Sequence, residues 1–310
     1  MRKFIVKILL FLVIMFAVDR MAGKVLAFLS SHPKGGMTFR RNYITDYSKD
    51  EVLIFGSSRA HYHYNPQIIK DSLGLSCYNC GEDAMGIILF YAWWKLISQR
   101  YHPNLVIYEV TPLYDIRESQ NNYYLWRLRR YYDREGISDI FNQVDSKERW
   151  KMLSWMYRYN STFTELAADI VHPLKLGGDR GFVGVNRKIK KHDGLGKPLF
   201  QGVTLKSDTL KLDMFEKMIQ EMGSTQLVFT ASPSLYGVND SVYASIKEIC
   251  QKYDIPFLDY SNSPKYLRKD HYFFDSYHLN AEGADVFTSE LTEDLRSIMN
   301  RRQNEPKDKR

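Results

Sequence analysis

The chain has few cysteines, three in 310 residues. Three cysteines permit at most one internal disulfide, which excludes a small disulfide-stapled scaffold. Cys77 and Cys80 form a C-x-x-C pattern, but no second cysteine pair exists that could complete a zinc site with them. We therefore expect two partly buried thiols here, with a redox or disulfide role as the alternative.

The sequence also lacks nucleic-acid-binding motifs, internal repeats and histidine-rich zinc-hydrolase signatures. The net charge is +7, from 43 Lys and Arg against 36 Asp and Glu. Much of the excess lies at the two ends, in residues 1–7 and 299–310. A basic end is typical of a solvated or membrane-facing segment, so we predict no nucleic-acid partner.

A His-x-His pattern, His61 and His63, could hold a metal ion together with His278 or Asp275. Two histidines on one loop give little support to such a site. We expect them to line a substrate cleft or to face solvent, and we predict neither a metal nor another cofactor.

The first residues read as a targeting segment. Arg2, Lys3 and Lys7 precede an apolar run from Ile8 to Val18. No small-x-small cleavage site follows, which favours an uncleaved, single-pass signal anchor at residues 1–24 over a cleaved signal peptide. The run is short, because a spanning helix needs about 20 residues. By the positive-inside rule, we expect the rest of the chain to face the periplasm or the cell exterior.

Beyond a polar linker at 30–50, short apolar strands alternate with helical segments. Continuous apolar strands predict a parallel sheet with helices on both faces. The predicted fold is α/β, a three-layer α/β/α sandwich with a five-stranded parallel, flavodoxin-like sheet. The predicted strands are 51–55, 75–78, 105–110, 227–231 and 255–259. The predicted helices are 66–73, 83–100 (capped by Asp83), 208–222, 240–252 and 281–299 (capped by Asn280).

Two motifs far apart in the sequence carry candidate chemistry. Gly-Ser-Ser-Arg at 56–59 follows the first strand, and Asp275 and His278 precede the last helix. A serine hydroxyl is a poor nucleophile at neutral pH unless an imidazole removes its proton. His278 can do this for Ser58, and Asp275 can orient the ring and stabilise its charged form. We expect the backbone N–H groups of Ser58 and Gly81 to bind the oxyanion of the intermediate.

With these residues, the chain resembles the SGNH (GDSL-type) hydrolase superfamily, and in particular membrane-anchored bacterial members with a Gly-Ser-Ser-Arg first block. The resemblance covers about residues 50–118 and 208–298. It implies that Ser58 is the nucleophile, that Gly81 is the glycine of the second block, and that Asp275 and His278 form the last block.

The third block departs from that family. It usually reads Gly-x-Asn-Asp, and its Asn supplies a side-chain donor to the oxyanion. Here the third predicted strand ends in Glu-Val-Thr-Pro at 109–112. Thr111, Arg59 or Asn79 could replace the missing donor. The departure also leaves open a specialised acyltransferase or a domain that only binds.

The alternation of strands and helices stops near residue 118 and resumes near 208. We therefore predict a hydrolase domain at 25–298, with its core at 50–118 and 208–298, an insertion at 119–207 and a basic tail at 299–310. The insertion includes a predicted long helix at 147–171. It also contains an aromatic and basic stretch with Trp126 and Arg127. That stretch either packs on the core or caps the active site, with aromatic rings on sugars and arginines on anionic groups.

The resemblance, the expected location and the aromatic insertion together imply a serine esterase. Its expected substrates are O-acyl esters, chiefly O-acetyl esters, of envelope or secreted polysaccharide. Arg59, His61, Trp126 and Arg127 are predicted to contact the substrate, and polysaccharide-assembly proteins are candidate partners. A polysaccharide O-acyltransferase with the same triad and a catalytically silent glycan-binding or assembly protein are the alternatives.

Overall fold

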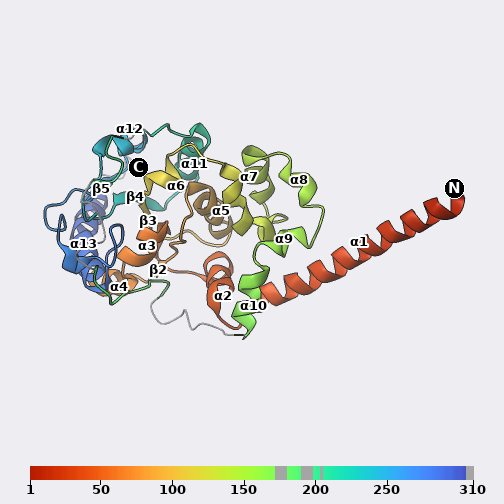
Figure 1. Cartoon of the computed structure of the whole chain (residues 1–310). Coiled ribbons are helices and arrows are strands. Elements are labelled where there is room, and N and C mark those ends of the chain that lie inside the picture. Colours follow the sequence, from red (N-terminus) through yellow and green to blue (C-terminus); the bar gives the residue numbers. More distant parts are fainter. Residues whose placement is uncertain (172–179, 190–197, 203–204, 305–310) are drawn as a thin grey trace. The chain divides into compact units, whose positions relative to one another are not determined.

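The structure is a computed structural model that describes residues 1–171, 180–189, 198–202 and 205–304 (Figure 1). Its chain divides into two compact units. The helical unit comprises Met1–Ser48, Tyr91–Arg100 and Gln120–Leu176, and the sheet unit comprises Lys49–Phe90, Tyr101–Ser119 and Gly177–Arg310. This division differs from the predicted one, because it separates 120–176 from the rest of the predicted insertion and groups it with the first 48 residues.

The sheet unit is built on five parallel strands. The strands are β1 (Val52–Gly56), β2 (Cys77–Asn79), β3 (Leu105–Glu109), β4 (Gln226–Ala231) and β5 (Phe257–Asp259). Their order is β2-β1-β3-β4-β5, which confirms the predicted five-stranded, flavodoxin-like sheet. Every residue of β1, β3 and β4 is buried. This explains why these strands read as continuous apolar runs rather than as alternating ones.

Helices cover both faces of this sheet. On one face, Ile54 and Ile107 belong to an apolar cluster that also contains Phe287 of α13. That face is covered by α3 (Ser58–His63), α4 (Pro66–Leu73) and α13 (Ala281–Asn304). On the other face, the ring of Tyr108 lies 5.1 Å from that of Phe215 between centroids. Phe215 belongs to α11 (Thr209–Gln220), which contacts α12 (Ala244–Tyr253).

Side-chain caps fix several helix ends where the sequence predicts them. The Asp208 carboxylate accepts hydrogen bonds from the N–H groups of residues 210 and 211 at the start of α11. Asn280 accepts one from Gly283 N–H at the start of α13. Gly74 ends α4 in the left-handed conformation, as expected of a C-terminal glycine. The remaining short helices of the sheet unit are α6 (Pro112–Asp115), η4 (Asp240–Tyr243) and η5 (Asp270–Tyr272).

One predicted cap is wrong. Helix α5 spans Ile87–Ser98, so Asp83 does not cap it. The carboxylate that does so comes from a distant position, because Asp115 accepts a 2.8 Å hydrogen bond from Ile87 N–H. Asp83 instead accepts hydrogen bonds from the side chains of His61 and Tyr62.

The helical unit contains α1 (Arg2–Ser31), α2 (Gly36–Asn42), α7 (Ile137–Val144) and several shorter helices. The predicted polar linker at 30–50 is wrong, because α1 continues to Ser31 and α2 is followed by a π-helical turn, η1 (Tyr43–Tyr47). Arg100 stabilises that turn by donating hydrogen bonds to the carbonyl oxygens of Thr45 and Ser48. Among the residues that the structure describes, no helix is both long and apolar enough to cross a membrane.

The predicted long helix at 147–171 is also wrong. Three short helices replace it, α8 (Glu148–Lys151), α9 (Tyr157–Asn160) and α10 (Phe163–Val171). The Asp19 carboxylate of α1 accepts hydrogen bonds from the Trp155 and Met156 N–H groups and from the Ser154 hydroxyl. These bonds satisfy backbone groups that a continuous helix would use internally, so the helix is interrupted at this point.

Candidate active site

The turn between β1 and α3 presents Ser58. Gly56 adopts a φ of 138°, and a Cβ there would lie 2.7 Å from the Glu109 carbonyl oxygen, so only glycine fits. Ser57 and Arg59 are buried, whereas Ser58 between them is partly exposed. Of the two adjacent serines, therefore, only Ser58 offers its hydroxyl to a ligand.

The loop before α13 brings His278 and Asp275 to that hydroxyl. His278 Nε2 lies 2.8 Å from Ser58 Oγ, and its Nδ1 lies 3.0 Å from both carboxylate oxygens of Asp275. A carboxylate can only accept, so it favours the tautomer with the proton on Nδ1 and leaves Nε2 as the acceptor for the serine proton. The structure thus brings together the three residues predicted as nucleophile, base and orienting acid.

Asp275 is held in its ionised form. Burial alone would raise the pKa of this carboxyl, but the hydrogen bonds from the His278 ring and from the Tyr277 and His278 N–H groups lower the pKa below its ordinary value. The carboxylate therefore stays negative at neutral pH, where it can stabilise a positive imidazolium on His278.

Two aromatic rings that the sequence did not indicate hold the His278 imidazole in place. Phe274 stacks on it, with centroids 5.4 Å apart and planes 11° from parallel. Tyr62 meets it edge-on at 5.4 Å. Tyr62 also donates a 3.1 Å hydrogen bond to Asp83; burial, together with this carboxylate, raises the pKa of Tyr62 to about 12. The spacing of Tyr62 four residues after Ser58, one helical turn on, could have indicated it.

His61 and His63 do not face solvent, because both are buried. The His61 Nδ1 lies 2.9 Å from Asp83 Oδ1. Gly81 packs directly on this turn, since a Cβ at residue 81 would lie 2.4 Å from the His61 backbone nitrogen. A contact between His61 and the substrate stays a prediction.

Arg59 is wrongly predicted as a substrate-binding or oxyanion residue. Its Nε donates to Glu109 Oε1 at 3.0 Å and lies 3.1 Å from Ser232 Oγ. Its Nη2 donates to the Ser232 backbone carbonyl, and the side chain is buried. The guanidinium is therefore committed to the interior, where it neutralises a buried carboxylate.

Asn79 is wrongly predicted as an oxyanion donor. Its Nδ2 donates both protons to backbone carbonyls, to Ala60 O at 2.7 Å and Tyr64 O at 2.9 Å. Its Oδ1 accepts from Gly81 N–H at 2.9 Å. Asn79 thus fastens the end of β2 to α3. The same bond occupies the Gly81 N–H, so Gly81 is not available as the donor that the sequence predicted.

Thr111 remains as a side-chain donor. Its N–H donates to Asp115 at 2.7 Å, but within the described residues its buried Oγ1 has no hydrogen-bond partner. A buried hydroxyl without a partner is costly unless a ligand or water satisfies it. Ser58, as the first residue of α3, has an N–H that no preceding helical turn satisfies. The Ser58 N–H and the Thr111 hydroxyl stay predictions as donors to the oxyanion.

Glu109 is the important residue that sequence reasoning missed. It ends β3, is fully buried, and accepts hydrogen bonds from Arg59, Tyr64 and the Ser232 backbone and side chain. It occupies the start of the departing third block. An acidic residue at the end of an apolar strand, together with an arginine directly after Ser58, could have indicated this buried ion pair.

Trp126 and Arg127 belong to the helical unit, on η2 (Asn121–Arg127), which is followed by η3 (Arg129–Tyr131). The Arg127 guanidinium lies 3.8 Å from the centre of the Trp126 ring and donates a 2.9 Å hydrogen bond to Glu165. Its charge is thus paired within the unit. Substrate contacts of both residues stay predictions.

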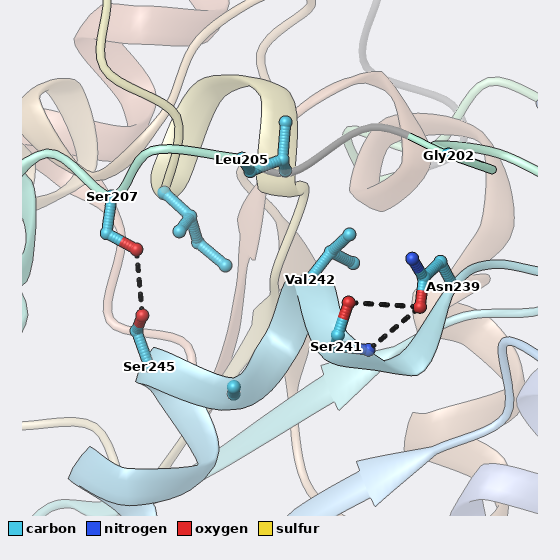
Figure 2. Close-up of a pocket in the computed structure, with 9 residues that line it drawn as sticks. Gly202, Leu205, Ser207, Asn239, Ser241, Val242 and Ser245 are labelled. Carbon is cyan, nitrogen blue, oxygen red and sulfur yellow. Dashed lines mark hydrogen bonds between the residues drawn. The ribbon is translucent and has the colours of Figure 1, made fainter.

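The sheet unit also contains a pocket of about 410 Å³, formed by segments that follow β3 and β4 (Figure 2). It is lined by Ile116, Gly202, Leu205, Ser207, Asn239, Ser241, Val242, Ala244 and Ser245, and by none of the three residues Ser58, His278 and Asp275. Figure 2 shows its hydroxyl groups paired with protein atoms, Ser207 with Ser245 at 2.8 Å and Ser241 with Asn239 at 3.0 Å. The pocket therefore adds no reactive group to the site.

No family model and no curated protein matches the chain. Similar solved structures include a candidate acylhydrolase from Bacteroides fragilis, with 12% identity, a TM-score of 0.39 and coverage of 80% of this chain and 86% of that one. Another is a candidate GDSL-like lipase from Parabacteroides merdae, with 10% identity, a TM-score of 0.38 and coverage of 78% and 93%. A third is the acetylxylan esterase Axe2 of Geobacillus stearothermophilus, with 11% identity, a TM-score of 0.37 and coverage of 78% and 92%. At such low identities and TM-scores, these structures carry no argument about the function of this chain.

Proposed function

We propose that this protein is a serine esterase that removes O-acyl groups, chiefly acetyl groups, from polysaccharide. One observation carries the proposal: the continuous hydrogen-bond chain from Ser58 Oγ through His278 to Asp275, with distances of 2.8 and 3.0 Å. A nucleophile, a base and an orienting acid in that geometry are the parts that acyl transfer to serine requires.

In the proposed reaction, the Ser58 oxygen attacks the ester carbonyl carbon while His278 Nε2 takes the hydroxyl proton. The resulting oxyanion is bound by the Ser58 N–H and the Thr111 hydroxyl, each worth about 3 kcal/mol of transition-state stabilisation. When the intermediate collapses, the imidazolium gives its proton to the leaving sugar oxygen, and an acyl group stays on Ser58. Water then repeats the sequence, with His278 as its base, and releases the carboxylic acid.

The carbohydrate part of the proposal is supported by the resemblance of the sequence and by the aromatic and basic stretch around Trp126. A polysaccharide O-acyltransferase would follow the same first half-reaction, with a sugar hydroxyl replacing water in the second. The replacement of the third-block Asn by Thr111 and its neighbours favours a second candidate, a glycan-binding or assembly protein that has lost catalysis.

Labelling with a fluorophosphonate tests the catalytic proposal. We expect an adduct on Ser58 that is absent from Ser58→Ala and slow to form in His278→Ala. The matched control is Ser57→Ala, because the Ser57 hydroxyl is buried and has no hydrogen-bond partner among the described residues. Folded protein that forms no adduct would favour the binding or assembly function instead. In that case, Trp126→Ala should impair glycan binding more than Ser58→Ala does.

We further propose that the first part of α1 attaches the protein to a membrane, with the sheet unit outside the cytoplasm. The support is the apolar surface of this segment, where Phe4, Val13 and Phe16 are 66%, 64% and 60% exposed. Flotation with lipid vesicles tests it. The full chain should float with the vesicles, and a variant with residues 8–18 replaced by Ser and Gln should not.

A further inference from the structure

His63 lies on α3, five residues after Ser58, and plays no part in the reaction proposed above. It is fully buried, and its ring is held from both sides. Its Nε2 accepts a 3.0 Å hydrogen bond from Leu279 N–H, and its Nδ1 lies 2.8 Å from Ser232 Oγ. A backbone N–H can only donate, so Nε2 must carry a lone pair and the ring proton of the neutral imidazole must be on Nδ1.

The direction of the next bonds follows from this assignment. Because Nδ1–H donates to Ser232 Oγ, that hydroxyl must give its own proton to another acceptor. It does so to Glu109 Oε1 at 2.9 Å, while the Ser232 N–H donates to Glu109 Oε2 at 2.9 Å. An unbroken chain of donors therefore runs from Leu279 through His63 and Ser232 to Glu109.

The same carboxylate also holds the nucleophile. Arg59, the residue directly after Ser58, donates to Glu109 Oε1 at 3.0 Å. Leu279 is the residue directly after His278. Glu109 thus anchors both the residue that follows the nucleophile and, through His63, the residue that follows the base. The two segments that must meet are joined to one buried group, although 220 positions separate Ser58 from His278.

We propose that His63 is a positioning residue that, as a neutral imidazole, fixes the Leu279 amide and thereby holds His278 at hydrogen-bonding distance from Ser58. This inference rests on the proposed esterase function. It gives a role to the second histidine of the His-x-His pattern, to Arg59 of the Gly-Ser-Ser-Arg block, and to Glu109, which begins the block that departs from the family.

The surroundings keep the ring neutral. Burial, with the positive charge of Arg59 and the nearby His278, lowers the pKa of His63 well below its ordinary value. The rings of His63 and His278 lie 6.0 Å apart between centroids, nearly perpendicular. The carboxylate that balances Arg59 is Glu109, one hydroxyl group away from His63. A protonated His63 could no longer accept from Leu279 N–H, so the neutral form is the one that holds the loop.

Two amide variants test the hydrogen bonds of the two His63 ring nitrogens separately. In His63→Gln, a carbonyl oxygen can take the place of Nε2 and accept from Leu279 N–H. In His63→Asn, the shorter amide can donate to Ser232 but cannot reach Leu279. The two variants are both neutral and polar, so a loss of folding stability alone should affect them similarly.

We expect His63→Asn to lower kcat for p-nitrophenyl acetate about 10- to 100-fold, the range that follows from misplacing a reacting group by a fraction of an ångström to 1 Å. KM and the pH profile of the remaining activity should change little, and fluorophosphonate labelling of Ser58 should slow in proportion to kcat. His63→Gln should retain most of the activity. Equal kcat values for the two variants, or losses that follow their melting temperatures, would overturn the proposal.

Nitrogen-15 NMR of the full chain separates a failure of this inference from a failure of the esterase proposal. We expect a His63 signal typical of the Nδ1–H tautomer that does not titrate from pH 5 to 8. We also expect His278 ring signals that shift or broaden in His63→Asn but not in His63→Gln. A wild-type chain that neither hydrolyses esters nor labels, but shows these signals, would overturn the esterase alone. A protonated or Nε2–H His63 would overturn the positioning role.

Discussion

Replacing Asp275 by Asn separates the electrostatic role of this carboxylate from its structural role. The Asn carbonyl oxygen can still accept from the Tyr277 and His278 N–H groups, which Asp275 Oδ1 binds at 2.8 and 2.9 Å, so the loop should keep its shape. The amide NH2 would then face His278 Nδ1. Because that group donates, it favours the tautomer with the proton on Nε2, and Nε2 could no longer accept the Ser58 proton.

The loss should be large, because an imidazole in the wrong tautomer cannot act as a base and no anion stabilises its charged form. A factor of about 10³ to 10⁴ in kcat corresponds to about 4 to 5 kcal/mol of transition-state stabilisation. We expect that decrease for Asp275→Asn in ester hydrolysis and in the rate of Ser58 labelling, with a melting temperature close to that of the wild type.

Asp83→Asn is the matched control. Asp83 also accepts a hydrogen bond from a histidine on the site, His61, with a distance of 2.9 Å between Nδ1 and Oδ1, and yet it should not take part in proton transfer. Its variant should keep most of the activity. The reasoning is refuted if Asp275→Asn retains more than about a tenth of the wild-type rate, or if Asp83→Asn loses as much as Asp275→Asn.

Three further predictions concern the framework of the site. Glu109→Gln should lower the unfolding free energy by about 3–5 kcal/mol in denaturant titrations, because it leaves the buried charge of Arg59 without its counter-ion. A decrease below about 1 kcal/mol would contradict the buried pairing. Gly56→Ala should lower the melting temperature more than Gly74→Ala. A Cβ at residue 56 would lie 2.7 Å from the Glu109 carbonyl oxygen, whereas a Cβ at residue 74 would meet nothing within 4 Å. Equal decreases in melting temperature would argue against the tight turn at Gly56. Burial raises the pKa of Asp115 to about 7, so the folded state holds a proton on this group that the unfolded state loses. The contribution of Asp115 to the unfolding free energy should therefore fall as pH rises from about 4 to 7. The wild type should lose more stability over this range than Asp115→Asn, and equal slopes would contradict the shift.

The parts of the fold that could be predicted are those encoded by local patterns. The strand β1 is apolar throughout because both of its faces are buried, and Ser58 is recognisable because it follows that strand directly. The Asp275 and His278 pair is recognisable by its spacing, since three residues of a turn bring the carboxylate against the ring. The alternation of strands with helices predicts a parallel sheet with helices on both faces.

The parts that could not be predicted depend on partners far away in the sequence. The pairing of Arg59 with Glu109 joins residues 50 positions apart, and no local pattern signals it. The helix predicted over 147–171 is interrupted by Asp19, whose bond to Ser154 spans 135 positions. Asn79 has the residue type of an oxyanion donor, but its amide protons are taken by carbonyl groups of α3 and the turn that follows it. In each case a polar side chain forms its hydrogen bonds with residues that a local sequence pattern does not reveal.

The two shortest strands, β2 and β5, lie at the two edges of the sheet, with three residues each. The unpaired backbone N–H and C=O groups of an edge strand can form hydrogen bonds with a strand of another chain, which leads to aggregation. On the β2 edge, Arg180 accepts from Asn79 N–H through its carbonyl oxygen and donates to Cys77 O through its side chain. On the β5 edge, the strand ends at Asp259, whose charge is paired with Lys247. The backbone of β2 is thus already paired at its outer edge, and β5 carries a charged pair at its end. A protease cut that released Arg180 would expose the outer edge of β2, in the same sheet that positions Ser58, so that loss of the proposed activity and aggregation would begin at the same place.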